Sequence, residues 1–169
     1  MINWLGRHAV SGLLLFCLGA SPSAVAEPEL NAETTCAAPL RAFQSEVAGA
    51  VNLQRDMPAL RAQMLQLLKR CQKVVEQQLA ELQQDFAELP PTSQCQQGLA
   101  DLQPFVPLFS EMQQQIDSQK LTTHNERRSA LDHFQAITPG LLRTVNGVFL
   151  HRYAVCLPEA ELRAQTVTP

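Results

Sequence analysis

The sequence predicts an all-α protein, an antiparallel bundle of four to six helices that two disulfides cross-link. Three observations favour this class. The helix formers Ala, Leu, Gln and Glu dominate the chain after residue 26. β-Branched residues are sparse and do not alternate with polar residues over the length of a strand. Turn residues divide the chain into blocks joined by short connections, which is typical of antiparallel neighbouring helices.

Residues 1–26 have the features of a cleavable secretory signal peptide. Arg7 precedes an apolar run over residues 9–20, and the A-V-A sequence at 24–26 matches the small-residue pattern of a cleavage site. The run of 12 residues is shorter than the roughly 20 that cross a membrane, and no second long apolar run follows. We therefore expect a periplasmic or secreted protein with no membrane span after cleavage.

After cleavage the chain is expected to form one domain. We expect a flexible leader over 27–35, a single helical domain over 36–165 and a disordered tail over 166–169. Cleavage removes Arg7 from the 13 Lys and Arg residues and leaves 12 against 16 Asp and Glu, a net charge of −4. This acidic balance argues against a nucleic-acid partner and against strong attraction to anionic lipid.

Two helices are predicted in the first half of the domain. The first runs from about Pro39 to Gln54, because proline is tolerated in the first turn of a helix. Asp56 is expected to cap the second helix, which has Pro58 near its start and continues to Leu89, before two prolines. Apolar residues recur every three or four positions along this second helix and predict one buried face. That face consists of Leu60, Met64, Leu67, Cys71, Val75, Leu79, Leu82, Phe86 and Leu89.

Several further helices are predicted in the second half of the domain. Ser93 is expected to cap a short helix, and another is expected over about 107–120. Thr123 and Glu126 have the spacing of a capping box for a helix that continues to about residue 137. Pro139 is expected to open a new helix that ends at about Cys156, before Pro158, with a final turn over 159–164. The apolar side of that penultimate helix is predicted to contain Leu142, Val145, Phe149, Tyr153 and Cys156.

Four cysteines remain in the chain once the signal peptide, which contains Cys17, is removed. A lipid anchor on Cys17 is the alternative, but bulky Phe16 precedes it where lipoprotein processing needs a small residue. In an oxidising compartment an even number of cysteines predicts disulfides. A hairpin about Arg55 would bring Cys36 opposite Cys71, so the predicted pairs are Cys36–Cys71 and Cys95–Cys156, although sequence leaves the other two pairings open.

No catalytic residue, metal site or cofactor is predicted. His124 and His133 are nine residues apart, so they point to opposite sides of a helix, and His151 projects away from the apolar face of its own helix. Neither a zinc motif nor a nucleophile motif occurs. Only a cluster formed across several helices would provide a metal site.

The candidate residues for binding a partner are Phe105, Val106, Phe109, Arg127 and Arg152. The first three lie in the segment 103–109, which contains prolines at 104 and 107, in a chain with few aromatic residues. This segment is either an exposed docking patch or a connector whose phenylalanines close one end of the core, and we favour the second interpretation. The two arginines lie near apolar stripes and either snorkel to solvent, which we favour, or pair with the acidic stretch Glu81, Asp85 and Glu88.

These observations favour a non-enzymatic exported protein that binds another protein, as an adaptor or in a chaperone-like role. The long amphipathic second helix and the 19 glutamines of the mature chain, which give uncharged hydrogen-bonding helix faces, support this expectation. An inhibitor or immunity protein against an extracytoplasmic toxin or enzyme is the first alternative. A helical bundle that carries a metal or cofactor is the second.

Overall fold

The computed structural model describes residues 31–167, and these form an all-helical bundle without strands. The predicted signal peptide and the first part of the predicted leader lie outside the described residues. In chain order the elements are η1 (Glu33–Ala37), α1 (Ala38–Ala48), α2 (Leu53–Asp85), α3 (Gln94–Leu102), α4 (Phe105–Ser118), α5 (His124–His151), η2 (Arg152–Cys156) and α6 (Leu157–Val167). The two η elements are short π-helical segments. Within residues 31–167, no helix is long and apolar enough to cross a membrane.

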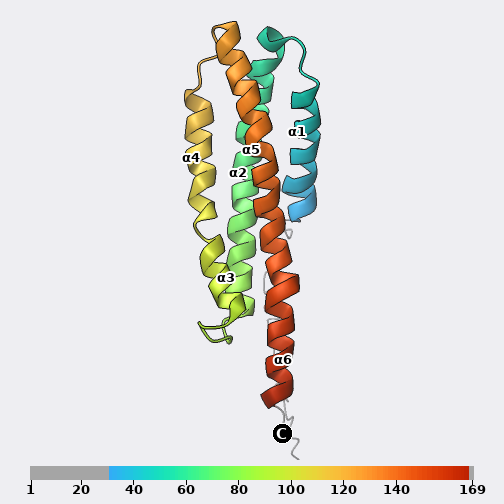
Figure 1. Ribbon diagram of the computed structural model, residues 1–169, viewed down its shortest axis with the longest axis vertical. Coiled ribbons are helices and arrows are strands. Elements are labelled where there is room, and N and C mark those ends of the chain that lie inside the picture. The colour runs from blue at the N-terminus through green and yellow to red at the C-terminus, as the bar shows by residue number, and fades with distance from the viewer. Residues whose placement is uncertain (1–30, 168–169) are drawn as a thin grey trace, which may run out of the picture.

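Helix α2 is the centre of the bundle. The helices α1, α4 and α5 lie alongside it, and α3 packs near its C-terminal end (Figure 1). The apolar face predicted for this helix is confirmed, because every residue from Leu60 to Leu89 in that stripe is buried. Phe86 and Leu89 belong to the turn after the helix and not to the helix itself. The buried stripe therefore continues past the last helical residue into the core.

The start of α2 corrects one prediction. The helix has 33 residues, as expected, but its cap is Asn52 and not Asp56, so it begins and ends four residues earlier. The Asn52 side chain accepts a hydrogen bond from the Arg55 backbone N–H at 3.2 Å, and Asp56 accepts one from the Asn52 backbone N–H at 3.1 Å. A hydrogen bond from the Arg55 side chain lowers the pKa of Asp56 below its usual value. Both residues thus satisfy free N–H groups at one helix end, but Asn52 is the cap because it directly precedes the first helical residue.

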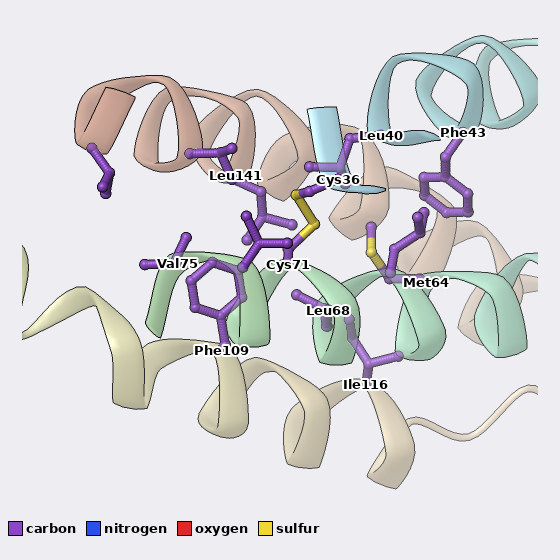
Figure 2. Close-up of a cluster of buried hydrophobic side chains, with 14 of the residues drawn as sticks. Cys36, Leu40, Phe43, Met64, Leu68, Cys71, Val75, Phe109, Ile116 and Leu141 are labelled. Atoms are coloured by element: carbon purple, nitrogen blue, oxygen red, sulfur yellow. A yellow bond between two sulfur atoms is a disulfide. The ribbon is translucent and has the colours of Figure 1, made fainter. Parts of the chain in front are cut away.

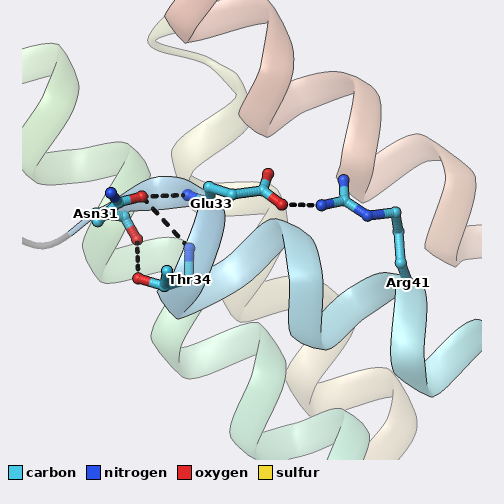
Figure 3. A network of polar contacts seen from close by, with 4 residues as sticks. All are labelled: Asn31, Glu33, Thr34 and Arg41. Carbon is cyan, nitrogen blue, oxygen red and sulfur yellow. Dashed lines mark hydrogen bonds and ion pairs between the residues drawn. The ribbon is translucent and has the colours of Figure 1, made fainter.

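The first helical segment begins within the range predicted as a leader. Asn31 caps it, because its side-chain oxygen accepts hydrogen bonds from the backbone N–H groups of Glu33 and Thr34 at 2.9 and 3.3 Å (Figure 3). Glu33 forms an ion pair with Arg41 of α1. Residues 31–35 therefore form the capped start of the first helical segment. Helix α1 ends at Ala48, with Gly49 as its C-cap, six residues before the predicted end.

Helices α5 and α6 form one continuous rod with the η2 segment between them (Figure 1). The predicted break at Pro139 is wrong, because this proline lies inside α5. An interior proline costs about 3 kcal/mol, whereas each large apolar side chain buried on the rod contributes about 1.5–3 kcal/mol. Buried residues on both sides of the proline, such as Phe134 and Leu141, outweigh the lost hydrogen bond. Pro158 does not end the helix either, because it lies in the first turn of α6.

The capping predictions for the other helices are confirmed. Ser93 accepts a hydrogen bond from the Gln96 backbone N–H at 3.1 Å at the start of α3. Thr123 and Glu126 form a complete capping box at the start of α5. Three hydrogen bonds to the Glu126 carboxylate, the largest effect coming from the Thr122 hydroxyl, lower its pKa from 4.5 to about 2.

Both predicted disulfides are present. Cys36–Cys71 joins the first helical segment to α2, and Cys95–Cys156 joins α3 to the C-terminal rod. Figure 2 shows the first disulfide inside the core, surrounded by buried side chains of α1, α2, α4 and α5, which include Leu40, Phe43, Met64, Leu68, Phe109, Ile116 and Leu141. Cys36 and Cys156 each lie in a π-helical segment. All four cysteines are fully buried.

Candidate functional site

The phenylalanines of the predicted binding segment have opposite environments. Phe109 is 1% exposed and reaches the core against α2, whereas Phe105 is 41% exposed. Val106 lies between these extremes, and Leu108 is exposed to the same extent as Phe105. The segment is helical from Phe105 onward, two residues earlier than predicted. Phe105 and Phe109, four residues apart, therefore share one side of α4, but only Phe109 reaches the core. One segment therefore both closes the core and offers apolar surface.

An apolar groove of about 520 Å³ lies between α4 and α5. Both helices pack on α2 and make few contacts with each other. We call this the α4–α5 groove; its lining is almost entirely apolar and comprises Leu102, Phe105, Leu108, Phe109, Met112, Ile137, Gly140, Leu141, Arg143, Thr144 and Gly147. The lining on α5 extends from Ile137 to Gly147, ten residue steps that correspond to about 15 Å along the helix axis.

The α5 side of the groove is open at two glycines, which have no side chain to fill it. A Cβ atom added at Gly140 or Gly147 would have no heavy atom within 4 Å. These glycines leave backbone surface open to an incoming ligand. Arg143 is an exposed charge in this lining, and no ion pair joins it to another residue of the described chain. The groove thus combines an apolar floor with one unpaired positive charge.

The two arginines singled out in the sequence have structural partners. The Arg127 side chain donates hydrogen bonds of 2.8 Å to the carbonyl oxygens of Leu121 and Thr122 and so holds the α4–α5 connection. Arg152 forms an ion pair with Asp85 at 2.5 Å, which ties the C-terminal rod to the end of α2. The acidic stretch therefore does have a basic partner in Arg152, while Arg127 lies elsewhere. Neither arginine lines the α4–α5 groove.

A second cleft of about 510 Å³ lies between α2, α5 and the start of η1. Phe149 and Tyr153 border it as a tilted aromatic pair, with ring centroids 4.5 Å apart and exposed fractions of 51% and 53%. This corrects the prediction that both rings belong to the buried side of their helix, because the buried residues there are Leu141, Val145 and Val148. The lining is half polar, and the Gln78 side-chain oxygen in it is buried without a hydrogen-bond partner among residues 31–167.

Cys95, His151 and Cys156 come together at the junction of α3 with the C-terminal rod. Their Sγ and ring nitrogen atoms all lie within 4.8 Å of one another. The sequence prediction placed His151 at the surface, but its ring is half-buried and its Nε2 lies 2.8 Å from the Cys95 carbonyl oxygen. Gly98 admits this ring, because a Cβ atom there would lie 2.2 Å from the imidazole Cε1. Helical periodicity missed the cluster because Cys95 comes from α3, and because a π-helical segment, not regular α-helical spacing, separates His151 from Cys156 on the rod.

His124 is exposed, and the half-buried His133 forms a hydrogen bond of 2.7 Å with the Gln119 side chain. Among the described residues, the cysteine–histidine cluster is the one group of three potential metal ligands. Comparisons of the chain with family models, with curated proteins and with solved structures give no match.

Proposed function

We propose that this protein is exported and acts without enzymatic activity, by binding an amphipathic helix of a partner protein in the α4–α5 groove, as an adaptor or a chaperone-like factor. The observation that carries the proposal is the uncovered apolar groove itself. Export is supported by the signal-peptide pattern of residues 1–26 and by two disulfides, which persist in oxidising compartments.

The shape of the groove favours a helix as its occupant. Its α5 side continues for about 15 Å, which corresponds to about three turns of a docked helix. Helix axes approach one another within about 8–10 Å, depending on the side chains at the contact. Gly140 and Gly147 therefore allow a partner helix to lie close to α5. Phe105 and Leu108 of α4 would contact the other side of that partner helix. Recognition of this kind uses apolar residues at spacings of three, four and seven.

The charge of the groove favours a helix with an acidic residue on its flank. Arg143 is unpaired within the described chain, and a carboxylate of the partner would complete its interactions. Opposite charges at the edge of an interface contribute more to specificity and association rate than to affinity. We therefore expect the apolar contacts to supply most of the binding free energy.

The size of the effect follows from the exposure of the two apolar side chains. Complete burial of a Leu or Phe side chain contributes about 1.5–3 kcal/mol. Phe105 and Leu108 each expose 41% of their surface, so covering each one contributes about 1 kcal/mol. Replacing both by aspartate is expected to weaken binding at least about 30-fold, since 1.4 kcal/mol corresponds to tenfold in Kd.

The test uses a synthetic amphipathic helical peptide of about four turns with one glutamate on its flank. Fluorescence anisotropy of the labelled peptide measures its affinity for the protein. Gly147→Leu is expected to abolish binding without loss of helix content, because the new side chain enters the open groove. Val51→Asp, which changes an apolar residue that is 91% exposed away from the groove, is the matched control and should bind normally. Equal binding by all variants would contradict the proposal.

Photo-crosslinking then connects the groove to the natural partner. A photoreactive residue at position 105 is compared with one at position 51 in the exported protein. A crosslink at position 105 to one protein, absent when Gly147→Leu is added, would support an adaptor role. If that one protein is a toxin or an enzyme, the result would support an inhibitor. Many unfolded proteins crosslinked at 105 support a chaperone-like role. Crosslinking only to fatty acids or other lipids at 105 would refute a protein partner.

A further inference from the structure

We propose that Cys95, Cys156 and His151 bind one zinc ion when the Cys95–Cys156 disulfide is reduced. The three residues come from α3, from the end of α5 and from η2, so they form a cluster across the contact between α3 and the C-terminal rod. A cystine and a zinc ion would then be alternative cross-links between the same two parts of the fold. This inference does not depend on the α4–α5 groove.

The distances between the ligand atoms suit a metal ion. In tetrahedral zinc sites the Zn–S distance is about 2.3 Å and the Zn–N distance about 2.0–2.1 Å, so neighbouring ligand atoms lie about 3.5–3.8 Å apart. The two Sγ atoms and a ring nitrogen of His151 lie within 4.8 Å of one another. The two sulfur atoms are bonded in the disulfide, so reduction must let them separate from about 2 Å to about 3.8 Å. A shift of about 1 Å in each cysteine side chain provides this separation and completes the three-ligand arrangement.

The hydrogen bond of His151 prepares its ring for a metal. The Cys95 carbonyl oxygen can only accept, so the Nε2 that lies 2.8 Å from it carries the proton and donates. In this tautomer the other nitrogen, Nδ1, keeps the lone pair that a metal needs, so the proposal assigns Nδ1 to the zinc ion. Metal-binding histidines usually donate their second ring N–H in this way, which fixes the tautomer and the ring orientation. Gly98 maintains this position because it leaves room for the imidazole.

The chemistry balances with a thiol reductant. Two thiol equivalents transfer two electrons and two protons to the disulfide, become a disulfide themselves and leave Cys95 and Cys156 as thiols. Zinc then displaces both thiol protons and binds two thiolates and one neutral imidazole. The bound unit has no net charge, which suits two fully buried cysteines. Two sulfurs and an imidazole nitrogen favour zinc over magnesium or calcium, which prefer oxygen ligands.

The experiment titrates zinc into the full exported chain, kept reduced by a phosphine without oxygen. A chromophoric chelator reports the affinity, and elemental analysis reports the number of ions per chain. The reduced protein is expected to bind one zinc ion and the oxidised protein none. Cys95→Ser combined with Cys156→Ser should abolish binding. Cys36→Ser combined with Cys71→Ser removes the same number of thiols and should still bind one ion.

Histidine variants separate a built site from two thiols alone. His151→Ala is expected to weaken zinc binding by more than the ten- to hundredfold that loss of an outer-shell group costs. His133→Ala, which removes a half-buried histidine outside the cluster, is expected to have no effect. If the reduced chain unfolds, zinc should restore its helical circular dichroism. Unchanged affinity in His151→Ala or no bound zinc in the reduced chain would overturn the proposal, as would a reduced chain that unfolds and does not recover its helix on adding zinc.

Discussion

The clearest test of the packing compares the same substitution at two phenylalanines of α4. Phe109 is 1% exposed, and its ring packs in the core against α2. Replacing a fully buried phenylalanine by alanine costs about 3–5 kcal/mol, which includes both lost transfer free energy and the cavity that remains. Phe105 is 41% exposed, so the same change there costs about 1–2 kcal/mol.

The measurement is chemical denaturation of Phe109→Ala, Phe105→Ala and the parent protein with the disulfides intact, followed by circular dichroism. For a domain of this size each kcal/mol corresponds to about 3–5 °C in Tm, so Phe109→Ala should also lower Tm by at least about 10 °C. In addition, Phe105→Ala should weaken peptide binding in the groove. Equal losses of stability at both positions, or a larger loss at Phe105, would refute the assignment of one ring to the core and the other to the surface.

Two further predictions concern single helix positions. Gly147→Ala should raise the free energy of unfolding by about 0.5–1 kcal/mol, because alanine has the higher helix propensity. Gly98→Ala should have a free energy of unfolding about 1 kcal/mol below that of Gly147→Ala, because the new Cβ displaces the His151 ring and breaks its hydrogen bond. Thermal unfolding of both variants measures this difference, and equal Tm values would contradict the tight contact at Gly98. Hydrogen bonds lower the pKa of Glu126 to about 2 from 4.5, so its stabilising contribution is complete above about pH 4.5 and disappears as the pH falls through 2. Glu126→Gln should therefore have a lower Tm than the parent at pH 7, with a difference that vanishes towards pH 2; a difference that does not change with pH would contradict this.

Local patterns predicted the helix starts where the cap and its target lie within one turn. Ser93 and Thr123 act as predicted because a cap is decided by a side chain and an N–H group three residues later. The predicted start of α2 was four residues too late. The Asn52 side chain accepts from the Arg55 N–H and the Asp56 carboxylate accepts from the Asn52 N–H, so both polar side chains belong to the first turn, and the helix begins after Asn52.

The helix ends and breaks were less predictable because tertiary packing competes with local preference. Pro139 and Pro158 have the local chemistry of helix breaks, yet the rod continues through both. The buried residues on either side of Pro139 contribute more free energy than the missing hydrogen bond costs. Tertiary packing also left Phe149 and Tyr153 exposed, although both follow the apolar spacing of their helix, because α2 packs against a neighbouring side of α5.

The sequence by itself determined the all-helical class and the buried face of α2, because these depend on periodicity along single helices. It favoured the two observed disulfide pairs through one expected hairpin, but left the other two pairings open until the structure decided between them. The tertiary structure decided that α4 and α5 stand apart, which opens the groove beside Phe105, and that His151 meets Cys95 and Cys156. Both features depend on the distance and rotation between helices that are far apart in the chain. Those quantities are set by how all the side chains pack together, which no local pattern specifies.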